Sequence, residues 1–303
     1  MKVSVVICTY NRELYILDSL SSVKDQTCSK DLYEVILVDN NSTDSTSLKC
    51  MEFMHQKGNL NFHYYKEEKQ GLSHARNRGI EVAKGEIIVF LDDDAVACKE
   101  YIHEIISFFD LHLNVWAIGG RIFPKYEAKC PTWMPQELTP LFSIIDLGKN
   151  DKEFGSNKYP VGANMAFRRS VFESCGVFNT SLGRTGKNML GGEEKDMFYR
   201  MKLKGGVVWY AANPWIYHII PENRTTKYFI KKQAIGVGQS EYFRTKSSFI
   251  QFTKSIIVEK MKWIASCLFA CKYILLFQFS KAKMLFQFRC WVSIGLLNLE
   301  KVD

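Results

Sequence analysis

Three consecutive carboxylates, Asp92, Asp93 and Asp94, follow directly after the apolar run Glu86–Leu91. Like charges this close repel one another, and a folded protein accepts that cost where a cation or a polar ligand offsets it. Divalent cations such as Mg²⁺ prefer carboxylate oxygens and are commonly held together with substrate phosphates. The triplet therefore indicates a site for a metal ion and a diphosphate, the alternative being a solvated turn after a strand.

Two further apolar runs also end in polar residues: Val3–Cys8 leads into Thr9, and Glu34–Val38 leads into Asp39. Each run is continuous rather than alternating, which is typical of parallel strands covered by helices on both faces. Helical patterns separate the runs, at residues 13–25, 43–57 and 73–84. This alternation predicts an α/β fold. Because ligands in open α/β sheets bind beyond the carboxyl ends of the strands, we expect Thr9, Asp39 and Asp92 to converge on one site.

The composition is that of a globular protein. The chain has 303 residues and 47% hydrophobic content, enough for a substantial buried core. Its nine cysteines are odd in number and lack the spacing of a zinc or redox site, which fits reduced thiols in the cytoplasm. The apolar run after Lys2 is shorter than the core of a signal peptide, so we expect a protein that is not secreted.

Charge is distributed unevenly along the chain. Residues 226–303 carry +9, whereas residues 1–225 carry −1. Such an asymmetry indicates two regions with different partners. We therefore predict a first domain over residues 1–225 and a basic, aromatic-rich helical tail over residues 226–303.

Four segments together carry a resemblance to a known family. They read VSVVICTYNR, VDNNSTD, GLSHARNRG and FLDDD, and they begin at Val3, Val38, Gly71 and Phe90. In order and spacing they resemble the successive motifs of family 2 glycosyltransferases, over roughly residues 1–225. The resemblance implies a GT-A fold, which is a Rossmann-like nucleotide-diphospho-sugar transferase fold, here with a helical C-terminal extension. It also implies an inverting transfer of a sugar from a nucleotide diphosphate donor, with Mn²⁺ or Mg²⁺.

The resemblance implies a donor site on the first three motifs. A carboxylate such as Asp39 can accept the N3–H of a uracil base, while Thr9, Tyr10 and Arg12 could flank the base and ribose. Arg76 is expected at the diphosphate, because a guanidinium group matches the geometry of phosphate oxygens. Its alternative is a surface arginine on a helix. The expected donor is therefore a UDP-sugar.

The metal site is expected at the triplet. Similarity to the family's Asp-x-Asp motif assigns Asp92 to the ribose and metal region and Asp94 to the metal, with Asp93 between them in the donor site. His218 stands where several members of the family place a histidine that completes the metal shell, and Mn²⁺ tolerates such a mixed site. The alternative for His218 is a buried core residue.

Inversion needs a base, and the segment from Gly191 to Arg200 resembles the family's Gly-Glu-Asp-x-Asp motif. Glu194 takes the position of the residue that deprotonates the acceptor hydroxyl, although Glu193 and Asp196 are alternatives. A neighbouring carboxylate would raise the pKa of the base toward a useful value. These acids could also mark a helix N-terminus, whose dipole attracts them.

Three neighbouring segments complete the expected site. Residues 161–167 resemble the family strand whose small residues let the donor sugar approach, with Asn164 offering hydrogen bonds. The glycine-rich residues 182–192 are expected to order over the bound donor, the alternative being an ordinary loop. Residues 125–157 match no motif, and we expect acceptor recognition there.

The tail shows helical periodicity. Apolar residues recur at alternating spacings of four and three, at Ile257, Met261, Ile264, Leu268, Cys271 and Leu275. A helix spanning the membrane would hold Lys272 at mid-depth, which is costly. We therefore expect helices that lie in the membrane interface with lysines on anionic headgroups, the alternative being packing on the first domain or a second subunit. Because the basic residues sit among aliphatic stretches, no nucleic acid partner is expected.

Together these features predict an inverting glycosyltransferase at the cytoplasmic face of the membrane. It would move a sugar from a UDP-sugar to a hydroxyl of a saccharide acceptor, lipid-linked, in the synthesis of a cell-surface polysaccharide or glycoconjugate. One alternative is a sugar-phosphate nucleotidyltransferase, which would need a glycine-rich, basic loop that the N-terminus lacks. Another is a non-catalytic nucleotide-sugar or lipid-binding protein, to which the glutamate at position 194 would point.

Overall fold

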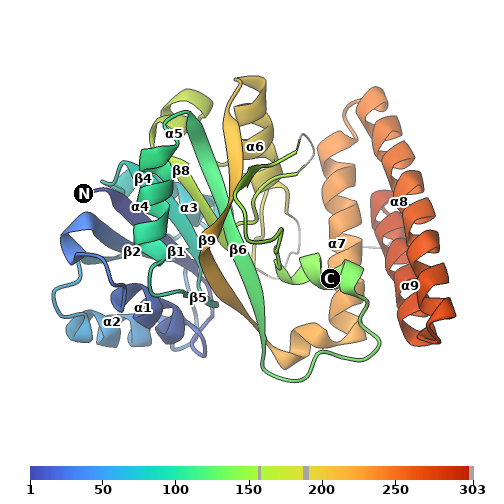
Figure 1. The fold of residues 1–303 in the computed structure, drawn as a ribbon, viewed down its shortest axis with the longest axis horizontal. Coiled ribbons are helices and arrows are strands. Elements are labelled where there is room, and N and C mark those ends of the chain that lie inside the picture. The colour runs from blue at the N-terminus through green and yellow to red at the C-terminus, as the bar shows by residue number, and fades with distance from the viewer. Residues whose placement is uncertain (156–157, 187–190, 300–303) are drawn as a thin grey trace. The chain divides into compact units, whose positions relative to one another are not determined.

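The computed structural model describes residues 1–155, 158–186 and 191–299. The chain divides into two compact units (Figure 1). The first comprises residues 1–125, 143–181 and 193–219, and the second comprises residues 126–142, 182–192 and 220–303.

A nine-stranded sheet organises the first unit. Its strands are β1 (Val3–Thr9), β2 (Tyr33–Asp39), β3 (Phe62–Lys66), β4 (Ile87–Asp92), β5 (Ala95–Ala97), β6 (Val115–Tyr126), β7 (Lys152–Glu153), β8 (Asn164–Arg168) and β9 (Val207–Ile220). They run in the order β3-β2-β1-β4-β8-β6-β9-β5, with β7 on β9. The first four are parallel, as predicted for β1, β2 and β4 from their continuous apolar runs, whereas β3 was not predicted. The sequence did not predict that β8 pairs antiparallel with β4 and β6, or that β9 pairs antiparallel with β5 and β7.

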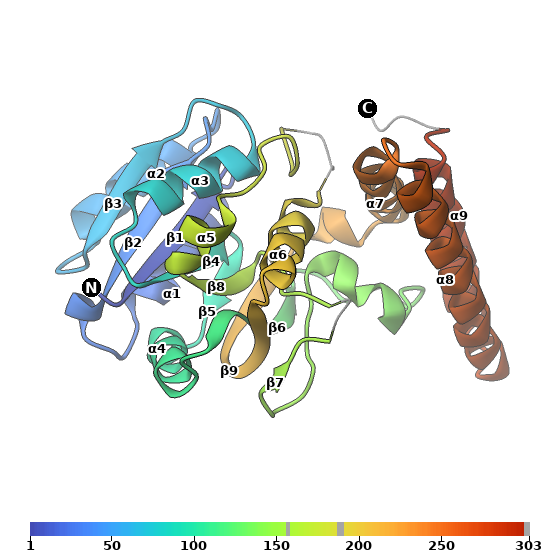
Figure 2. The ribbon, with the colours of Figure 1, turned by 90° about the horizontal axis from the view of Figure 1, so that it is seen from above.

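Helices cover both faces of this sheet (Figures 1 and 2). They are α1 (Ile16–Lys24), α2 (Thr46–Gln56), α3 (Leu72–Val82), α4 (Tyr101–Leu111), α5 (Ser170–Cys175) and α6 (Glu193–Leu203), with a short 3-10 helix, η1, at Lys30–Leu32. Side chains of α1, α2 and α4 share one core cluster with Val5 and Ile7 of β1, whereas those of α3, α5 and α6 share another with Val6. Because successive strand residues point to opposite faces, the two clusters lie on opposite sides of the sheet.

Register places the predicted strand ends side by side. Thr9 pairs with Asp39, and Cys8 pairs with Asp92 on the other side of β1. All three strands are parallel, so these polar residues share one edge of the sheet. The predicted convergence of Thr9, Asp39 and Asp92 is confirmed at the level of the backbone.

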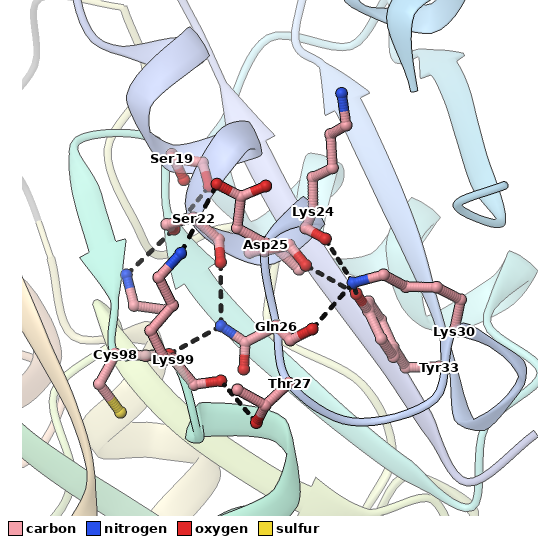
Figure 3. Close-up of polar contacts among 12 residues, drawn as sticks. Ser19, Ser22, Lys24, Asp25, Gln26, Thr27, Lys30, Tyr33, Cys98 and Lys99 are labelled. Carbon is pink, nitrogen blue, oxygen red and sulfur yellow. Dashed lines mark hydrogen bonds and ion pairs between the residues drawn. The ribbon is translucent and has the colours of Figure 1, made fainter. Parts of the chain in front are cut away.

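Hydrogen bonds from α1 and from the residues that follow it hold the segment that carries the triplet (Figure 3). The Gln26 side-chain amide donates to the carbonyl oxygen of Cys98 at 2.7 Å, just beyond β5. Within α1, the Ser19 hydroxyl donates to the carbonyl oxygen of Asp92 at 3.2 Å. Because Asp92 is bonded to α1 and Cys98 is bonded to Gln26 just beyond that helix, the segment from Asp92 to Cys98 is anchored at both ends.

The second unit is mainly helical. Its elements are η2 (Gln136–Phe142), η3 (Glu222–Thr225), α7 (Lys227–Thr245), α8 (Phe249–Leu275) and α9 (Phe279–Leu296). Figure 1 shows α8 and α9 side by side in opposite directions. Backbones of α7 and α9 approach so closely that a side chain at Gly238 or Gly295 would overlap the other helix. Within the described residues, no helix combines the length and apolar character needed to cross a membrane.

Candidate active site

Asp92, Asp94 and His218 form an acidic cluster at the strand ends. Their ligand atoms all lie within 4.8 Å of one another. His218 reaches the cluster because it pairs with Ala95 across β9 and β5, and its Nε2 lies 2.9 Å from Asp94 Oδ1. Asp94 and His218 are buried. Two carboxylates and an imidazole are a donor set that suits Mn²⁺, and the carboxylates also suit Mg²⁺. The structure thus brings together the three residues expected to hold the metal.

The middle carboxylate of the triplet has a different partner. Arg12 Nε lies 3.2 Å from Asp93 Oδ1, and Arg12 Nη2 lies 3.7 Å from Asp94 Oδ2. Burial raises the pKa of Asp93 to about 6, because the opposing effect of Arg12 is smaller and Asp94 raises it further. Arg12 therefore offsets part of the charge of the triplet, and both residues remain beside the expected donor site.

Asp39 is held rigidly at the same edge. Its Oδ1 accepts from the backbone N–H of Ser42 at 2.9 Å, and its Oδ2 accepts from the hydroxyls of Tyr64 at 2.9 Å and of Ser47. A carboxylate oxygen offers two lone pairs, so Oδ1 retains one for a ligand. Thr9 beside it is buried, and Tyr10 is half-buried.

Arg76 takes a position that its sequence motif did not suggest. This buried arginine places Nη1 3.0 Å from Glu193 Oε1 and Nη2 3.1 Å from Glu194 Oε1. Its guanidinium also lies 5.3 Å from the ring centre of Phe178. In the structure Arg76 pairs with two carboxylates in the first turn of α6, and its contact with a diphosphate stays a prediction. No local sequence signal connects residues this far apart in the chain.

Glu194 has the properties of a general base. Its side chain is 21% exposed, against 5% for Glu193. Burial raises the pKa of Glu194 to about 7, since the lowering effect of Arg76 is smaller and Glu193 raises it again. A carboxyl group that titrates near neutral pH suits proton abstraction. Gly162 lies against this pair, and an added Cβ would overlap both Glu194 Oε1 and Arg76 Nη2.

The third candidate acid lies apart from the buried pair. Asp196 Oδ2 is 2.9 Å from Arg200 Nε, one turn along α6, and both side chains are 27% exposed. This is the geometry of a helix-surface ion pair. Of the three acids, Glu194 alone is both partly accessible and bonded to Arg76.

Asn164, expected to bond the donor sugar, is buried in the fold. Its Oδ1 accepts from the Tyr101 hydroxyl at 2.8 Å, and its Nδ2 donates to the carbonyl oxygens of Pro214 at 2.8 Å and Arg121 at 3.2 Å. Both amide hydrogens are therefore already used to join β8 to β6 and β9. The expected covering loop, residues 182–192, includes residues 187–190, which lie outside the described part of the chain.

Comparison with protein families and curated proteins gives a consistent result. Residues 4–176 match the family Glycosyl transferase family 2. The chain is 29% identical over 232 residues to a glucosyl-dolichyl phosphate glucuronosyltransferase of Haloferax volcanii, covering 74% of this chain and 71% of that protein. It is 37% identical over 131 residues to the poly(ribitol-phosphate) β-N-acetylglucosaminyltransferase TarS of Staphylococcus aureus, covering 41% of this chain and only 23% of TarS.

Solved structures share the fold. The mannosyltransferase PcManGT from Pyrobaculum calidifontis, in complex with GDP-Man and Mn²⁺, aligns with a TM-score of 0.66 at 17% identity, covering 99% of this chain and 88% of that chain. A structure of S. aureus TarS 1-349 with UDP-GlcNAc aligns with a TM-score of 0.58 at 19% identity, covering 100% and 93%. At these identities the likeness shows the fold alone. The chain has the GT-A fold, belongs to glycosyl transferase family 2 and is a glycosyltransferase.

Proposed function

We propose that residues 1–225 catalyse the inverting transfer of a sugar from a UDP-sugar to a hydroxyl of a lipid-linked saccharide, in the synthesis of a cell-surface polysaccharide or glycoconjugate. The observation that carries the proposal is the pairing of two features in one compact unit. A carboxyl group with a pKa of about 7, Glu194, accompanies a metal-ligand cluster at Asp92, Asp94 and His218. An inverting transfer can use the first to take the proton of the acceptor and the second to stabilise charge on the diphosphate that leaves.

The donor is proposed to bind at the polar strand ends. Asp92, Asp94 and His218 would hold Mn²⁺ or Mg²⁺, which when bound stabilises negative charge on the diphosphate leaving group. Asp39 would accept the N3–H of uracil through the free lone pair of Oδ1, because Tyr64 and the Ser42 backbone fix the direction of its carboxylate. The structures of TarS with UDP and UDP-GlcNAc and of PcManGT with GDP-Man and Mn²⁺ support a metal-assisted nucleotide-sugar donor.

Glu194 is proposed to take the proton of the acceptor hydroxyl as the oxygen attacks the sugar. Arg76 holds the Glu194 carboxylate in place through its 3.1 Å contact, and it balances the charge of the buried Glu193. Gly162 leaves room for this pair, since any side chain there would displace it. Arg76 is therefore a positioning residue for the base.

A lipid-linked acceptor is proposed from a relative that aligns with most of the chain. The Haloferax protein is named for a reaction on a glucosyl-dolichyl phosphate, which is a lipid-linked sugar, and it shares 74% of this chain. The acceptor would approach Glu194 with its hydroxyl and remain attached to the lipid surface.

Hydrolysis of a panel of UDP-, GDP- and dTDP-sugars with Mn²⁺ tests the proposal, because water can replace the unknown acceptor. We expect turnover with a UDP-sugar and much less with GDP-sugars. Asp39→Ala should weaken UDP binding far more than binding of free diphosphate. Equal losses for both ligands would show that Asp39 does not contact the base. Binding of UDP-sugars without any turnover, with or without lipid-linked saccharides, would favour the non-catalytic alternative.

A further inference from the structure

The apolar and polar faces of α8 are reversed relative to a helix that packs into a core. Its buried residues are small or polar, except for one aromatic: Ser255, Glu259, Ser266, Ala270 and Tyr273. The apolar stripe predicted from sequence faces outward instead. Its members Ile257, Met261, Ile264, Leu268 and Leu275 are 56% to 79% exposed. A contiguous exposed apolar stripe of this kind marks an interaction surface.

Apolar residues continue past both ends of the stripe. Phe249 and Ile250 at the start of α8 are exposed, as are Phe277 in the turn before α9 and Phe279 at the start of α9. The helix has 27 residues. At a rise of about 1.5 Å per residue it offers an apolar line about 40 Å long. A surface of this length fits a partner that α8 can lie along, rather than a pocket that receives one side chain.

Lysines border the stripe on both sides. At roughly 100° per residue, Lys254 and Lys272 project about 60° to one side of the stripe and Lys260 about 60° to the other. All three are exposed. Long lysine side chains can keep the charge at a polar boundary while their aliphatic stems cover apolar surface. This is the arrangement of a helix that lies at a lipid–water interface with its charges on headgroups.

The charge of this region decides between a lipid surface and a second copy of the chain. From Ser247 to Leu299 the sequence has one acidic residue, Glu259. Its Oε1 lies 3.2 Å from Arg289 Nη1, on the buried side of α8. In a coiled coil formed by two copies, residues such as Lys260 and Lys272 would border the seam without an acid to complement them. An anionic lipid surface would instead pair with all of the lysines that border the stripe.

The opposite side of α8 contacts the segment expected to recognise the acceptor. The Tyr273 hydroxyl donates to Glu137 Oε2 at 2.8 Å and accepts from the backbone N–H of Gln136 at 3.2 Å, both in η2. These contacts lie within the second unit. One helix thus has an apolar, lysine-bordered outer face and an inner face that anchors η2.

We infer that the outer face of α8, from Phe249 to Leu275, is a docking surface for an anionic lipid bilayer and lies flat in its interface. The inference rests on the proposed function in one respect: a lipid-linked acceptor would explain why the enzyme binds a bilayer. Docking through α8 would bring η2 to the surface where such an acceptor is found.

Sedimentation with vesicles tests the inference. The probes are vesicles of phosphatidylcholine alone and vesicles in which roughly one-third of the lipid is phosphatidylglycerol. We expect the full chain to sediment with the anionic vesicles and to be released by high salt, which screens the lysines. Replacing Met261, Ile264 and Leu268 together by glutamine should weaken the binding at least about 10-fold. Replacing Lys254, Lys260 and Lys272 by glutamine should weaken it roughly 100-fold, at about five-fold for each lysine.

A matched control uses three apolar residues exposed on the first unit. Leu111, Leu113 and Leu203 are 70% to 79% exposed, so their replacement by glutamine makes the same chemical change without touching α8. This control should bind vesicles like the parent chain. Equal binding by the α8 stripe variant and the control would overturn the inference.

Light scattering tests whether the stripe binds a second copy of the chain instead of a bilayer. A dimer that the α8 stripe variant abolishes, without any vesicle binding by the parent chain, would assign the stripe to a second copy. UDP binding by the same variants keeps the two proposals apart. A stripe variant that loses vesicles but keeps UDP supports the membrane surface alone, whereas a parent chain that binds vesicles but no UDP-sugar contradicts only the proposed function.

Discussion

Replacing Gly162 by alanine should impair catalysis without removing any functional group. The added methyl would lie inside contact distance of Glu194 Oε1 and Arg76 Nη2 and 2.9 Å from the carboxyl carbon of Glu194. Ordinary contacts between a carbon and its neighbours begin near 3.5 Å, so the carboxylate must move by about 1 Å or more. A misplacement of about 1 Å can cost roughly 10²-fold in rate. We therefore expect kcat for UDP-sugar hydrolysis to fall by about that factor, with the Kd for UDP nearly unchanged.

Gly155→Ala is the matched control for this change. Nothing lies within 4 Å of a Cβ built at Gly155, and its backbone is not in the left-handed region. This variant should keep the parent kcat. Thermal unfolding of both variants would separate a displaced base from a loss of fold. Full activity in folded Gly162→Ala would refute the reasoning, because the carboxylate beside Gly162 could then not be the group that moves the proton.

Three further predictions concern the charges of the site. Because burial raises the pKa of Glu194 to about 7 from 4.5 in the unfolded chain, kcat should rise with pH between about pH 6 and pH 8. The contribution of Glu194 to the free energy of unfolding is fully present below pH 4.5 and is lost as pH rises through about 7. Glu194→Gln should therefore flatten the pH dependence of both kcat and stability. Asp94→Asn should abolish the Mn²⁺ dependence of UDP binding measured by calorimetry, and retention of that dependence would reject Asp94 as a metal ligand. Arg76→Met leaves the buried Glu193 and the partly accessible Glu194 without their partner and should cost about 3–5 kcal/mol of unfolding free energy in denaturant titrations. Arg78→Met, which removes a surface pair with Glu81 and a contact with the Tyr65 ring, should cost far less, about 1 kcal/mol.

Sequence reasoning located the strand ends well, because each signal was local. Continuous apolar runs marked β1, β2 and β4, and polar residues directly after them marked the shared edge. β3 was not predicted, because its sequence, Phe62–Lys66, is mostly polar or aromatic and only its first residue is buried. The antiparallel half of the sheet carried no motif that fixes strand direction.

Side-chain partners were beyond the reach of the sequence. A guanidinium group matches phosphate and carboxylate oxygens equally well, so a motif alone could not show that Arg76 pairs with Glu193 and Glu194. In the same way, the apolar spacing in α8 predicts a helix but not which face is covered. Only the packing of Ser266 and Ala270 inward shows that Ile264 and its neighbours face out.

The identity of the base is tested most directly by comparing Glu194→Gln with Asp196→Asn in the same hydrolysis assay. A base acts on the attacking hydroxyl in the transition state and contributes little to donor binding. Glu194→Gln should therefore lower kcat by roughly 10²–10⁴-fold while the Kd for UDP stays nearly constant. Asp196→Asn should cost far less, since Asp196 pairs with Arg200 on the helix surface. An active Glu194→Gln together with an inactive Asp196→Asn would contradict the account and move the base to Asp196.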